Sequence, residues 1–501
     1  MPISSVRRSA GLLLAVLALA ALSAVALTRA RAQVRAVLMQ PSVSEYAQVT
    51  ASETPPTEAQ CESVGRRCFT PQAIRAAYNV GPLYAQHLDG SGITIAIVDS
   101  YGNDNMAHDL HVYDQAFGLS PLCGEQDVTC TAGMPWFRTV SFQGSPATKA
   151  PPPTAKSPGQ EAKSAWALET SLDVETAHAM APGANILLVT TPTAETLGVQ
   201  GLPTMMNAEQ YVVDHHMADV ISQSFGTAED AFGSSQSLLT LRHAYISAAQ
   251  SGVTVLASSG DFGSAGTSKQ PVGQGGALLP NPTVGWPASD PLVTGIGGTY
   301  LCTDPTATSG RIVDSADPPV NCQNNPGQAE IGWIDAGGGY SHIFSRPSYQ
   351  DTLPAGSTPI PPSARGVPDV ALQASARTGP LMYVSLPPDG DSGLLCGSAP
   401  CSTGWYDIGG TSVSCPEWSG LIAIADQING GGLGPINQAL YTVAANPASY
   451  ASDYYDVTVG NNAAFAPDVP GYSNSPGWDP VTGLGTPNAA NLLPDLVAAA
   501  H

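Results

Sequence analysis

Short apolar runs alternate along the chain with longer segments of helical periodicity. Because the runs are nearly continuous in apolar and β-branched residues, they are typical of strands buried on both faces of a parallel sheet. The strands are expected at 93–98, 184–190, 220–224, 254–257 and 292–296. The helices are expected at 165–180, 204–216, 236–250 and 412–427. The alternation predicts an α/β fold, a doubly wound and mostly parallel sheet with helices on both faces.

The beginning of the chain has the order of a secretory signal peptide. Arg7 and Arg8 precede an apolar stretch, residues 10–27, and Ala30-Arg31-Ala32 provides small residues for cleavage. An uncleaved membrane anchor is the alternative, since the apolar stretch approaches the length that spans a bilayer. We expect a cleaved signal peptide over residues 1–32, and hence a secreted, extracellular protein with no other membrane segment.

The next segment, residues 33–68, shows no clear amphipathic period. We therefore expect a short pro-segment or linker there. Thr70-Pro71 then has the pattern of a helix start, with threonine at the N-cap and proline at the first helical position. We expect one large domain over residues 69–501.

The chain is strongly acidic, with 18 Lys and Arg against 40 Asp and Glu and a formal net charge of -22. A field of this sign repels phosphate backbones, so nucleic-acid binding is not expected. Basic side chains are few, so protonation of the carboxylates at low pH leaves little positive charge to repel itself. The composition thus favours tolerance of acid, although an acidic surface also serves simply to keep a secreted protein soluble.

The nine cysteines of an exported chain favour disulfides. Eight of them lie close together in pairs along the sequence. Proximity suggests that these pairs are bonded, although spacing alone does not fix connectivity. The pairs are Cys61 with Cys68, Cys123 with Cys130, Cys302 with Cys322, and Cys396 with Cys401. Cys415 is left over.

A serine follows a glycine-rich turn at Gly409-Gly410-Thr411-Ser412, where an apolar helix is expected to begin. The N–H groups and the dipole of a helix N-terminus stabilise developing negative charge, which suits a nucleophile. A bare Gly-Thr-Ser is more often an ordinary helix cap. The longer string through Ala423 resembles the nucleophile motif that subtilisin-like proteases and sedolisins share. This resemblance implies the subtilisin-like fold, with Ser412 as the nucleophile.

The two families differ in the group that removes the proton from the nucleophile. Subtilisins use a histidine, yet none of the nine histidines has the His-Gly-Thr-His setting of that family. Sedolisins carry carboxylates instead, and residues 166–175 resemble their Glu-x-x-x-Asp helix. Glu169 and Asp173 are four residues apart and so lie on one helix face, whereas His178 points away from Glu169. A solvated helix face is the alternative interpretation of such a pair.

On these motifs the chain is identified as a member of the sedolisin family, the serine-carboxyl peptidases. The resemblance implies that Glu169 takes the proton of Ser412, that Asp173 orients Glu169, and that an acyl-enzyme forms and is hydrolysed. Two close carboxyls share a proton, which supplies a base at low pH, where histidine does not. Residues 257–263 resemble the segment with the oxyanion aspartate, and Asp261 donates a hydrogen bond only when protonated. We therefore expect an acidic pH optimum.

Two further segments resemble binding elements of the same family. Ser224, Phe225 and Gly226 lie in a segment that resembles the strand end to which an extended peptide substrate adds as a further strand. Loops near the C-terminus resemble the family's calcium loop, and calcium takes carboxylate and carbonyl oxygens. The implied ligands of one structural calcium ion are the side chains of Asp456 and Asp479 and the carbonyls of Val457, Ser475 and Gly477. Without the resemblance, such aspartates are usually turn formers.

The resemblance has departures, and other functions compete with it. Sedolisins commonly have a large N-terminal prodomain, whereas only residues 33–68 precede the expected domain here. Cys415 and Ser475 stand where the family usually has small residues, and we expect Cys415 to serve as buried packing. The alternatives are a subtilisin-like protease that uses Asp99 and a histidine at neutral or alkaline pH, and a catalytically silent binding protein on the same fold. We expect a monomeric enzyme that acts on proteins or peptides.

Overall fold

The computed structural model of the chain describes residues 40–41, 45–142, 146–147, 160–192, 202–267, 278–306, 322–386, 394–396 and 399–501. Within this part, a nine-stranded sheet has the order β12-β11-β9-β7-β3-β6-β4-β5, with β15 also paired to β11. Its strands are β3 (Thr94–Ser100), β4 (Phe137–Phe142), β5 (Pro146–Ala147), β6 (Asn185–Thr191), β7 (Val220–Gln223), β9 (Thr254–Ser258), β11 (Thr294–Leu301), β12 (Glu330–Gly332) and β15 (Val370–Gln373). All pairs are parallel except β12 with β11 and β5 with β4.

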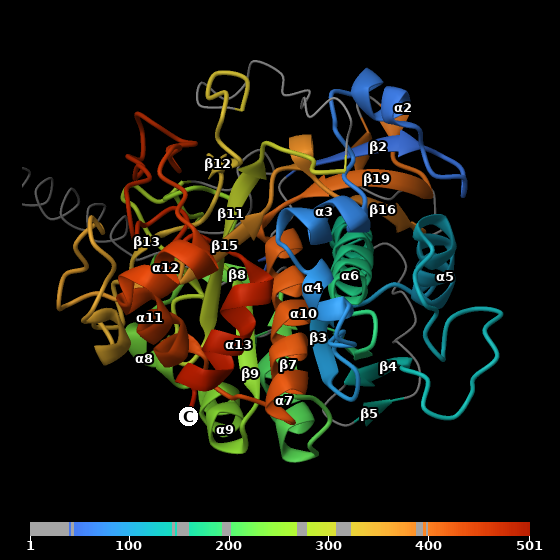
Figure 1. The fold of residues 1–501 in the computed structure, drawn as a ribbon, viewed down its shortest axis with the longest axis horizontal. Coiled ribbons are helices and arrows are strands. Elements are labelled where there is room, and N and C mark those ends of the chain that lie inside the picture. Colours follow the sequence, from blue (N-terminus) through green and yellow to red (C-terminus); the bar gives the residue numbers. More distant parts are fainter. Residues whose placement is uncertain are drawn as a thin grey trace, which may run out of the picture.

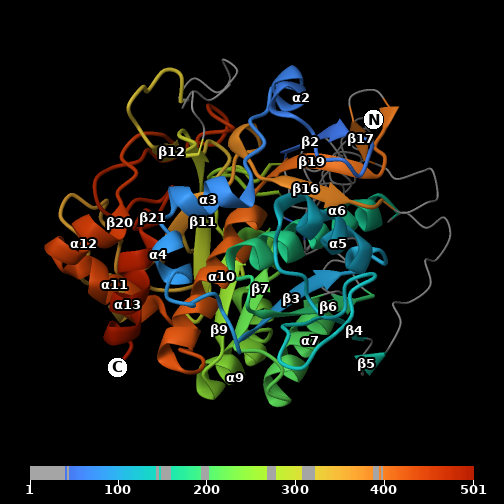
Figure 2. The same ribbon diagram turned by 45° about the vertical axis from the view of Figure 1, so that its right-hand side comes forward.

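Helices cover both faces of this sheet (Figure 1, Figure 2). On one face α10 packs against α6 and α13, and on the other α7 packs against α9. Their bounds are α6 (Gln160–Met180), α7 (Leu202–Asp214), α9 (His243–Ser251), α10 (Thr411–Asn429) and α13 (Ala489–Ala499). On β3, Ile95 and Ile97 belong to the core that contains residues of α10, while Ala96 and Val98 belong to the core that contains residues of α7. The predicted α/β fold with helices on both faces is confirmed.

Smaller elements surround these layers. The helices are α2 (Glu58–Ser63), α3 (Pro71–Ala77), α4 (Gly81–Tyr84), α5 (Met106–Phe117), α8 (Ser235–Leu239), α11 (Asn437–Ala445) and α12 (Pro447–Asp453). The strands are β1 (Gln40–Pro41), β2 (Glu45–Thr50), β8 (Phe225–Ala228), β10 (Gly285–Trp286), β13 (Gly339–Tyr340), β14 (Gly366–Val367), β16 (Leu381–Val384), β17 (Leu395–Cys396), β18 (Ala399–Pro400), β19 (Gly404–Gly409), β20 (Tyr454–Tyr455) and β21 (Thr486–Pro487).

Each expected strand falls on an observed one, with shifts at the ends. The helix expected at 236–250 is divided into α8 and α9. The division lies at Arg242, the N-cap of α9, whose Nη2 is 2.8 Å from Asp290 Oδ1. An ion pair with a residue distant in sequence leaves no mark on local periodicity, so the break was not foreseen.

The segment that begins at residue 45 is built into the fold by strand pairing. Strand β2 pairs antiparallel with β19, the strand that leads to Ser412, and β19 pairs on its other side with β16. In the register of the first pair, Glu45 lies opposite Gly409. All six residues of β2 are half-buried, so neither face of the strand is set apart by apolar residues, which explains the missing amphipathic period.

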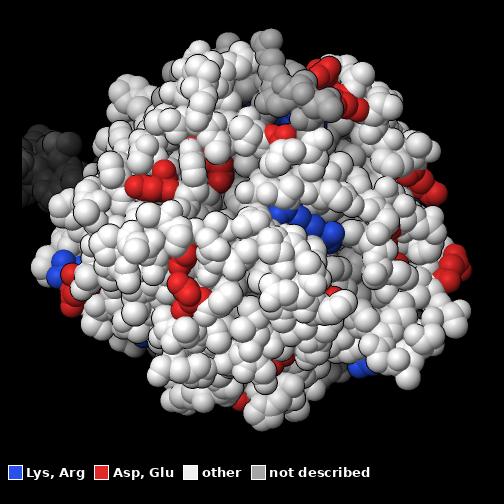
Figure 3. Space-filling view, viewed as in Figure 1, with Lys and Arg blue, Asp and Glu red and all other residues white. Residues whose placement is uncertain are grey.

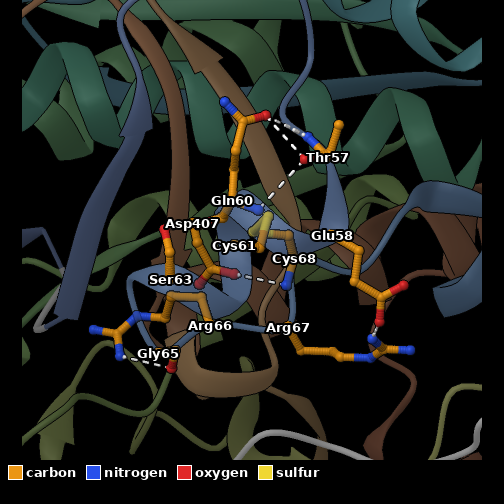
Figure 4. Close-up of a disulfide and its surroundings, with 10 residues drawn as sticks. All are labelled: Thr57, Glu58, Gln60, Cys61, Ser63, Gly65, Arg66, Arg67, Cys68 and Asp407. Atoms are coloured by element: carbon orange, nitrogen blue, oxygen red, sulfur yellow. Dashed lines mark hydrogen bonds and ion pairs between the residues drawn. A yellow bond between two sulfur atoms is a disulfide. The ribbon is translucent and has the colours of Figure 1, made fainter.

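The Cys61–Cys68 disulfide fastens the end of this segment (Figure 4). The backbone N–H of Cys68 donates to Asp407 Oδ2 at 3.2 Å, which ties the disulfide to β19. Beside it, Arg67 forms an ion pair with Glu58. The chain just before the main domain is thus held by a covalent bond, a hydrogen bond and a charge pair.

All four disulfides expected from proximity are present in the structure. Cys415 is free and buried, as expected. The expected signal peptide, residues 1–32, lies outside the described residues. Among the helices of the described ranges, none is long and apolar enough to cross a membrane.

Acidic side chains are divided between the surface and the interior. Figure 3 shows a face on which acidic side chains are scattered and basic ones are few. Many other carboxyls are fully buried, among them Asp99, Glu169, Asp173, Glu175, Glu209, Asp369 and Asp407. Burial disfavours the charged form of a carboxyl and raises its pKa. This interior is therefore better suited to acidic than to alkaline solution.

Candidate active site

The two carboxyls expected on one helix face lie on α6, and both are fully buried. Their neighbours Trp166, Leu168 and Leu172 are buried as well, and α6 packs against α10 and β3. Glu169 and Asp173 are therefore not part of a solvated helix face, and that interpretation is wrong. An i, i+4 pair of like charges inside a protein is costly, so the fold must hold it for a reason other than helix stability.

A third carboxyl, Asp99 at the end of β3, stands close to this pair. Burial raises the pKa of Asp173 well above its ordinary value, and the nearby Asp99 and Glu169 raise it further, while a hydrogen bond from Ser224 lowers it. Burial likewise raises the pKa of Asp99 to about 7, opposed by a hydrogen bond with Thr170. We name Asp99, Glu169 and Asp173 the carboxyl cluster. In the sequence, Asp99 was linked only to the subtilisin-like alternative.

Ser224 fixes one member of the carboxyl cluster. Its hydroxyl donates to Asp173 Oδ1 at 2.9 Å. Ser224 is the last residue before β8, the strand expected to bind substrate, so one side chain connects that strand to α6. The sequence analysis placed Ser224 in the substrate strand and did not foresee this bond.

The expected nucleophile, Ser412, lies in the first turn of α10. Gly410 forms the N-cap with φ 144°, a backbone conformation that side chains rarely allow, so the glycine here is required by the turn. Ser412 is fully buried, and its Oγ makes no hydrogen bond with any described residue. A buried hydroxyl without a partner is rare in a folded protein and calls for an explanation such as a catalytic role.

The contact between α6 and α10 brings the first turns of α10 to the carboxyl cluster. Cys415 lies one turn after the start of α10, close enough to two of the three carboxyls for their charges to change the pKa of its thiol. Burial raises the pKa of its thiol to about 12, a hydrogen bond with Ser222 lowers it, and the charges of Asp173 and Glu169 raise it. The structure thus brings the carboxyl pair and the start of α10 together from distant parts of the sequence.

Asp261 also lies at the start of α10, where it contacts Thr411. It follows the end of β9 and is buried. Its Oδ1 accepts hydrogen bonds from the N–H of Thr411 at 2.8 Å and from the hydroxyl of Thr411 at 2.9 Å. The N–H of Gly260 donates to that same hydroxyl at 3.0 Å. The Asp261 carboxyl is therefore bonded to the residue that precedes Ser412, at the start of α10.

No histidine serves Ser412 in the described structure, which includes all nine of them. The Ser412 hydroxyl has no hydrogen-bond partner there, histidine or other. His178, the one histidine near the carboxyls in sequence, is buried with its Nε2 3.0 Å from Asp114 Oδ2. It points away from the carboxyl pair, as its phase on the helix predicts.

The strand expected to bind substrate already carries an extended chain in this structure. Gln40 and Pro41 of β1 pair antiparallel with Gly226 and Phe225 of β8. Strand β1 also contacts α6, the helix that holds Glu169 and Asp173. The edge of β8 opposite β10 is thus paired with an extended segment of the chain itself, beside α6, which is the geometry of strand addition.

The residues expected to bind calcium also come together. The N–H of Gly477 lies 3.2 and 3.0 Å from the two carboxylate oxygens of Asp456. The N–H of Ser475 donates to Asp479 Oδ2 at 3.1 Å. These bonds join the loop at 456 to the loop at 475–479, so both aspartates reach one region.

In that region three oxygen atoms accept hydrogen bonds from one donor, the side-chain amide of Asn474. The amide nitrogen of Asn474 lies 3.0 Å from the Val457 carbonyl oxygen, 3.2 Å from Asp479 Oδ2 and 2.9 Å from Thr482 Oγ1. Within the described ranges, no group of three or more His, Cys, Asp or Glu could hold a metal ion. A calcium site would thus depend on carbonyl and hydroxyl oxygens beside the two aspartates, and this set of hard oxygen donors fits calcium. The sequence analysis did not name Asn474.

Comparison with known proteins places these features in a family. A sequence profile described as "Subtilase family" matches residues 159–449, which contain the carboxyl pair, Asp261 and Ser412. The chain belongs to the subtilase family. Kumamolisin from Bacillus sp. (strain MN-32) is 30% identical over 451 residues, 88% of this chain and 66% of that protein. Tripeptidyl-peptidase 1 from Homo sapiens is 30% identical over 358 residues, 68% of this chain and 53% of that protein.

A solved structure agrees on the fold of this subtilase. The structure described as Pseudomonas sedolisin (serine-carboxyl proteinase) complexed with two molecules of pseudo-iodotyrostatin matches with a TM-score of 0.60 at 24% identity, covering 85% of this chain and 97% of that one. The predicted sedolisin resemblance and the subtilisin-like fold are confirmed. The chain spans 66% of kumamolisin and 53% of human tripeptidyl-peptidase 1.

Because the carboxyl cluster is buried, we predict that the folded subtilase loses stability as the pH rises. The pKa of Asp99 is 3.8 when unperturbed and about 7 in the fold, so the folded chain binds more protons than the unfolded chain between these values. The protonated Asp99 therefore contributes its full stabilisation below pH 3.8, and this stabilisation is lost as the pH rises through about 7. We expect the melting temperature to fall by several degrees between pH ~4 and ~8, measured by differential scanning calorimetry.

Two variants make this measurement specific. Asp99→Asn replaces the acid with a neutral group of the same shape and should reduce the fall in melting temperature. Asp104→Asn, at an exposed position, should leave it unchanged. A wild-type protein that is more stable at pH ~8 than at pH ~4 would contradict the burial of protonated carboxyls.

Proposed function

We propose that this subtilase is a secreted serine-carboxyl peptidase that hydrolyses peptide bonds of proteins or peptides at acidic pH. The observation that carries the proposal is the contact of α6 with α10, which brings a buried carboxyl pair to the helix start that bears Ser412. Asp261, bonded to Thr411 in the same turn, adds the third element that acyl transfer requires. The relatives named above support this class of activity.

In the proposed mechanism, Ser412 Oγ attacks the carbonyl carbon of the substrate and its proton passes to Glu169. Asp173, fixed by Ser224, orients Glu169. The carbon–nitrogen bond then breaks, the proton goes to the leaving amine, and an ester on Ser412 remains. Water, activated by Glu169, hydrolyses this ester and restores the serine.

The acidic optimum follows from the groups involved. Asp261 contributes a hydrogen bond to the oxyanion only when its carboxyl carries a proton. Neighbouring carboxyls cannot all ionise in a buried site, so the cluster retains protons into the acidic range. A histidine base would act in neutral solution instead, and no histidine reaches Ser412 among the described residues. This observation favours the carboxyl mechanism over the subtilisin-like alternative with Asp99.

A panel of variants at pH ~4, below the ordinary histidine pKa, tests the proposal. Ser412→Ala and Glu169→Gln should each lower hydrolysis of a denatured protein by at least about a thousandfold, because they remove the nucleophile and its base. Asp173→Asn should lower kcat with less effect on KM, because it acts through Glu169. Glu175→Gln, a fully buried change on the opposite side of α6, should keep most of the activity.

Two results would contradict this assignment. Full activity of Glu169→Gln would exclude the carboxyl base. Full activity of Ser412→Ala would exclude this serine as the nucleophile, whereas binding of peptides with no turnover by the processed protein would support the silent binding protein on the same fold.

We also propose the order of segments along the chain: a signal peptide over 1–32, a pro-segment after it, and a monomeric peptidase domain from about residue 69 to 501. The four disulfides suit an oxidising, extracellular location. Gln40 and Pro41 occupy the edge of β8, so the pro-segment would block the substrate strand until it is cut. Residues 45–68 would stay attached to the mature enzyme through β2 and the Cys61–Cys68 disulfide.

The N-terminus of the purified protein checks this order. For the wild type we expect N-terminal sequencing to find a first residue after Pro41. Ser412→Ala, which cannot cut itself, should retain Gln40 and Pro41. A fully active wild-type protein that still begins at or before Gln40 would contradict a blocking role for this segment.

One structural calcium ion is part of the proposal. Asp456 and Asp479 would supply carboxylate oxygens, and Val457, Ser475 and Gly477 would supply carbonyls. A bound calcium ion would supply positive charge that holds the C-terminal loops together. The ion lies in no step of the reaction.

Calcium removal should therefore change stability. We expect a calcium chelator to lower the melting temperature, and calcium at ~100 times its dissociation constant to restore about 2.7 kcal/mol of unfolding free energy. Asp479→Asn should abolish this response, measured by calorimetry. Asp468→Asn, an exposed change in the same region, should keep it. A melting temperature that does not depend on calcium would exclude the site.

A further inference from the structure

The turn that leads to Ser412 is packed tightly against residues 374–376. The N–H of Gly410 donates to the carbonyl oxygen of Ala374 at 2.7 Å. At Gly409, an added Cβ would overlap the backbone nitrogen of Ala376, so no side chain fits between the two segments. The position at which α10 begins therefore depends on how residues 374–376 and the end of β19 are held together.

Strand β2 accompanies β19 to the end of that strand. The strands β2, β19 and β16 lie side by side in the structure (Figure 1, Figure 2). The register of β2 and β19 runs from Thr50 opposite Trp405 to Glu45 opposite Gly409. Because Gly409 is the last residue of β19 and Gly410 is the N-cap of α10, Glu45 is the residue of β2 that lies nearest in register to this turn.

The side chain of Glu45 connects β2 to the residues behind the turn. Its Oε1 lies 3.0 Å from Arg66 Nη2 and 3.5 Å from Arg377 Nη2. Arg377 belongs to the 3-10 turn η4 (Ala376–Thr378), which contacts both β2 and β19. Arg66 lies beside the Cys61–Cys68 disulfide (Figure 4). These side chains are partly buried, so salt screens their attraction less than that of an exposed pair.

The same charges reach the loop that supports Asp261. Burial raises the pKa of Asp335 to about 7, and there the charge of Glu45 raises it while the charge of Arg377 lowers it. The carbonyl oxygen of Asp335 accepts a hydrogen bond at 2.7 Å from the N–H of Gly263, two residues after Asp261. Glu45 is thus near both segments that carry the proposed machinery, the turn before Ser412 and the loop after β9.

We propose that Glu45 is a positioning residue of the peptidase reaction. Its ion pairs with Arg66 and Arg377 hold β2 against η4, and these two elements fix the turn that sets the place of Ser412. A misplacement of about 1 Å at a reacting group lowers the rate by up to about a hundredfold. The inference rests on the proposed function and adds that the processed enzyme must retain Glu45.

The kinetic constants of the processed protein test this role, with folding of each variant checked by calorimetry. Glu45→Gln keeps the size of the side chain and removes its charge, so we expect kcat to fall about tenfold while KM stays within about twofold. The Michaelis constant should change little because β8, the strand proposed to bind substrate, belongs to a different sheet from β2. Glu62→Gln, an exposed change in the same segment, should leave both constants unchanged.

A double-mutant cycle separates positioning from a general loss of stability. If Glu45 acts through Arg377, then Arg377→Gln should lower kcat to a similar extent, and the double variant should be no slower than either single variant. Glu45→Asp, which keeps the charge, should retain more of the wild-type kcat than Glu45→Gln does. If Glu45→Gln does not fold, Arg377→Gln and Arg66→Gln measure the same contact from its other side.

The outcomes separate the two levels of the account. Full kcat in Glu45→Gln, or losses in Glu45→Gln and Arg377→Gln that multiply in the double variant, overturns the role of Glu45 and leaves the peptidase function in place. If the wild-type protein shows no hydrolysis that depends on Ser412, the proposed function fails and the role of Glu45 fails with it.

Discussion

Carboxyl groups that share a buried space impose the main constraint on this structure. Where α6 lies against β3 and α10, the carboxyl cluster of Asp99, Glu169 and Asp173 is removed from water. Ionised carboxyls at close range in a low-dielectric interior repel each other strongly. The fold avoids this repulsion when the cluster keeps protons, as the raised pKa values of Asp99 and Asp173 indicate. A cluster of this kind stabilises the fold in acidic solution and destabilises it in alkaline solution.

The other parts of the candidate site are arranged around that cluster. The sheet carries Asp99 on β3 and leads through β9 to Asp261, while Gly410 turns the chain from β19 so that α10 begins at Thr411. Asp261 bonds to Thr411 and Ser224 bonds to Asp173, so two hydrogen bonds connect the loop after β9 and the start of β8 to the two helices. The residues proposed as substrate strand, acid, base and nucleophile thus depend on the same packing of α6 on α10.

Local patterns were sufficient for much of this account. The apolar runs predicted the sheet, and the four-residue spacing placed Glu169 and Asp173 on one face of α6. Contacts between distant segments could not be predicted in the same way. The approach of Asp99 to the pair depends on β3 lying beside α6, and the role of Asn474 depends on two loops meeting. Residues 45–50 gave no signal because all six are half-buried in β2, so no apolar face alternates with a polar one.

The central claim is that buried carboxyls, and not a histidine, activate Ser412. The pH dependence of kcat/KM for one peptide substrate, followed from pH ~3 to ~9 with the processed protein, tests it most directly, because that range covers the titration of carboxyl and imidazole groups. The account predicts a maximum in the acidic range and a decline before neutrality. A maximum at neutral or alkaline pH would contradict it.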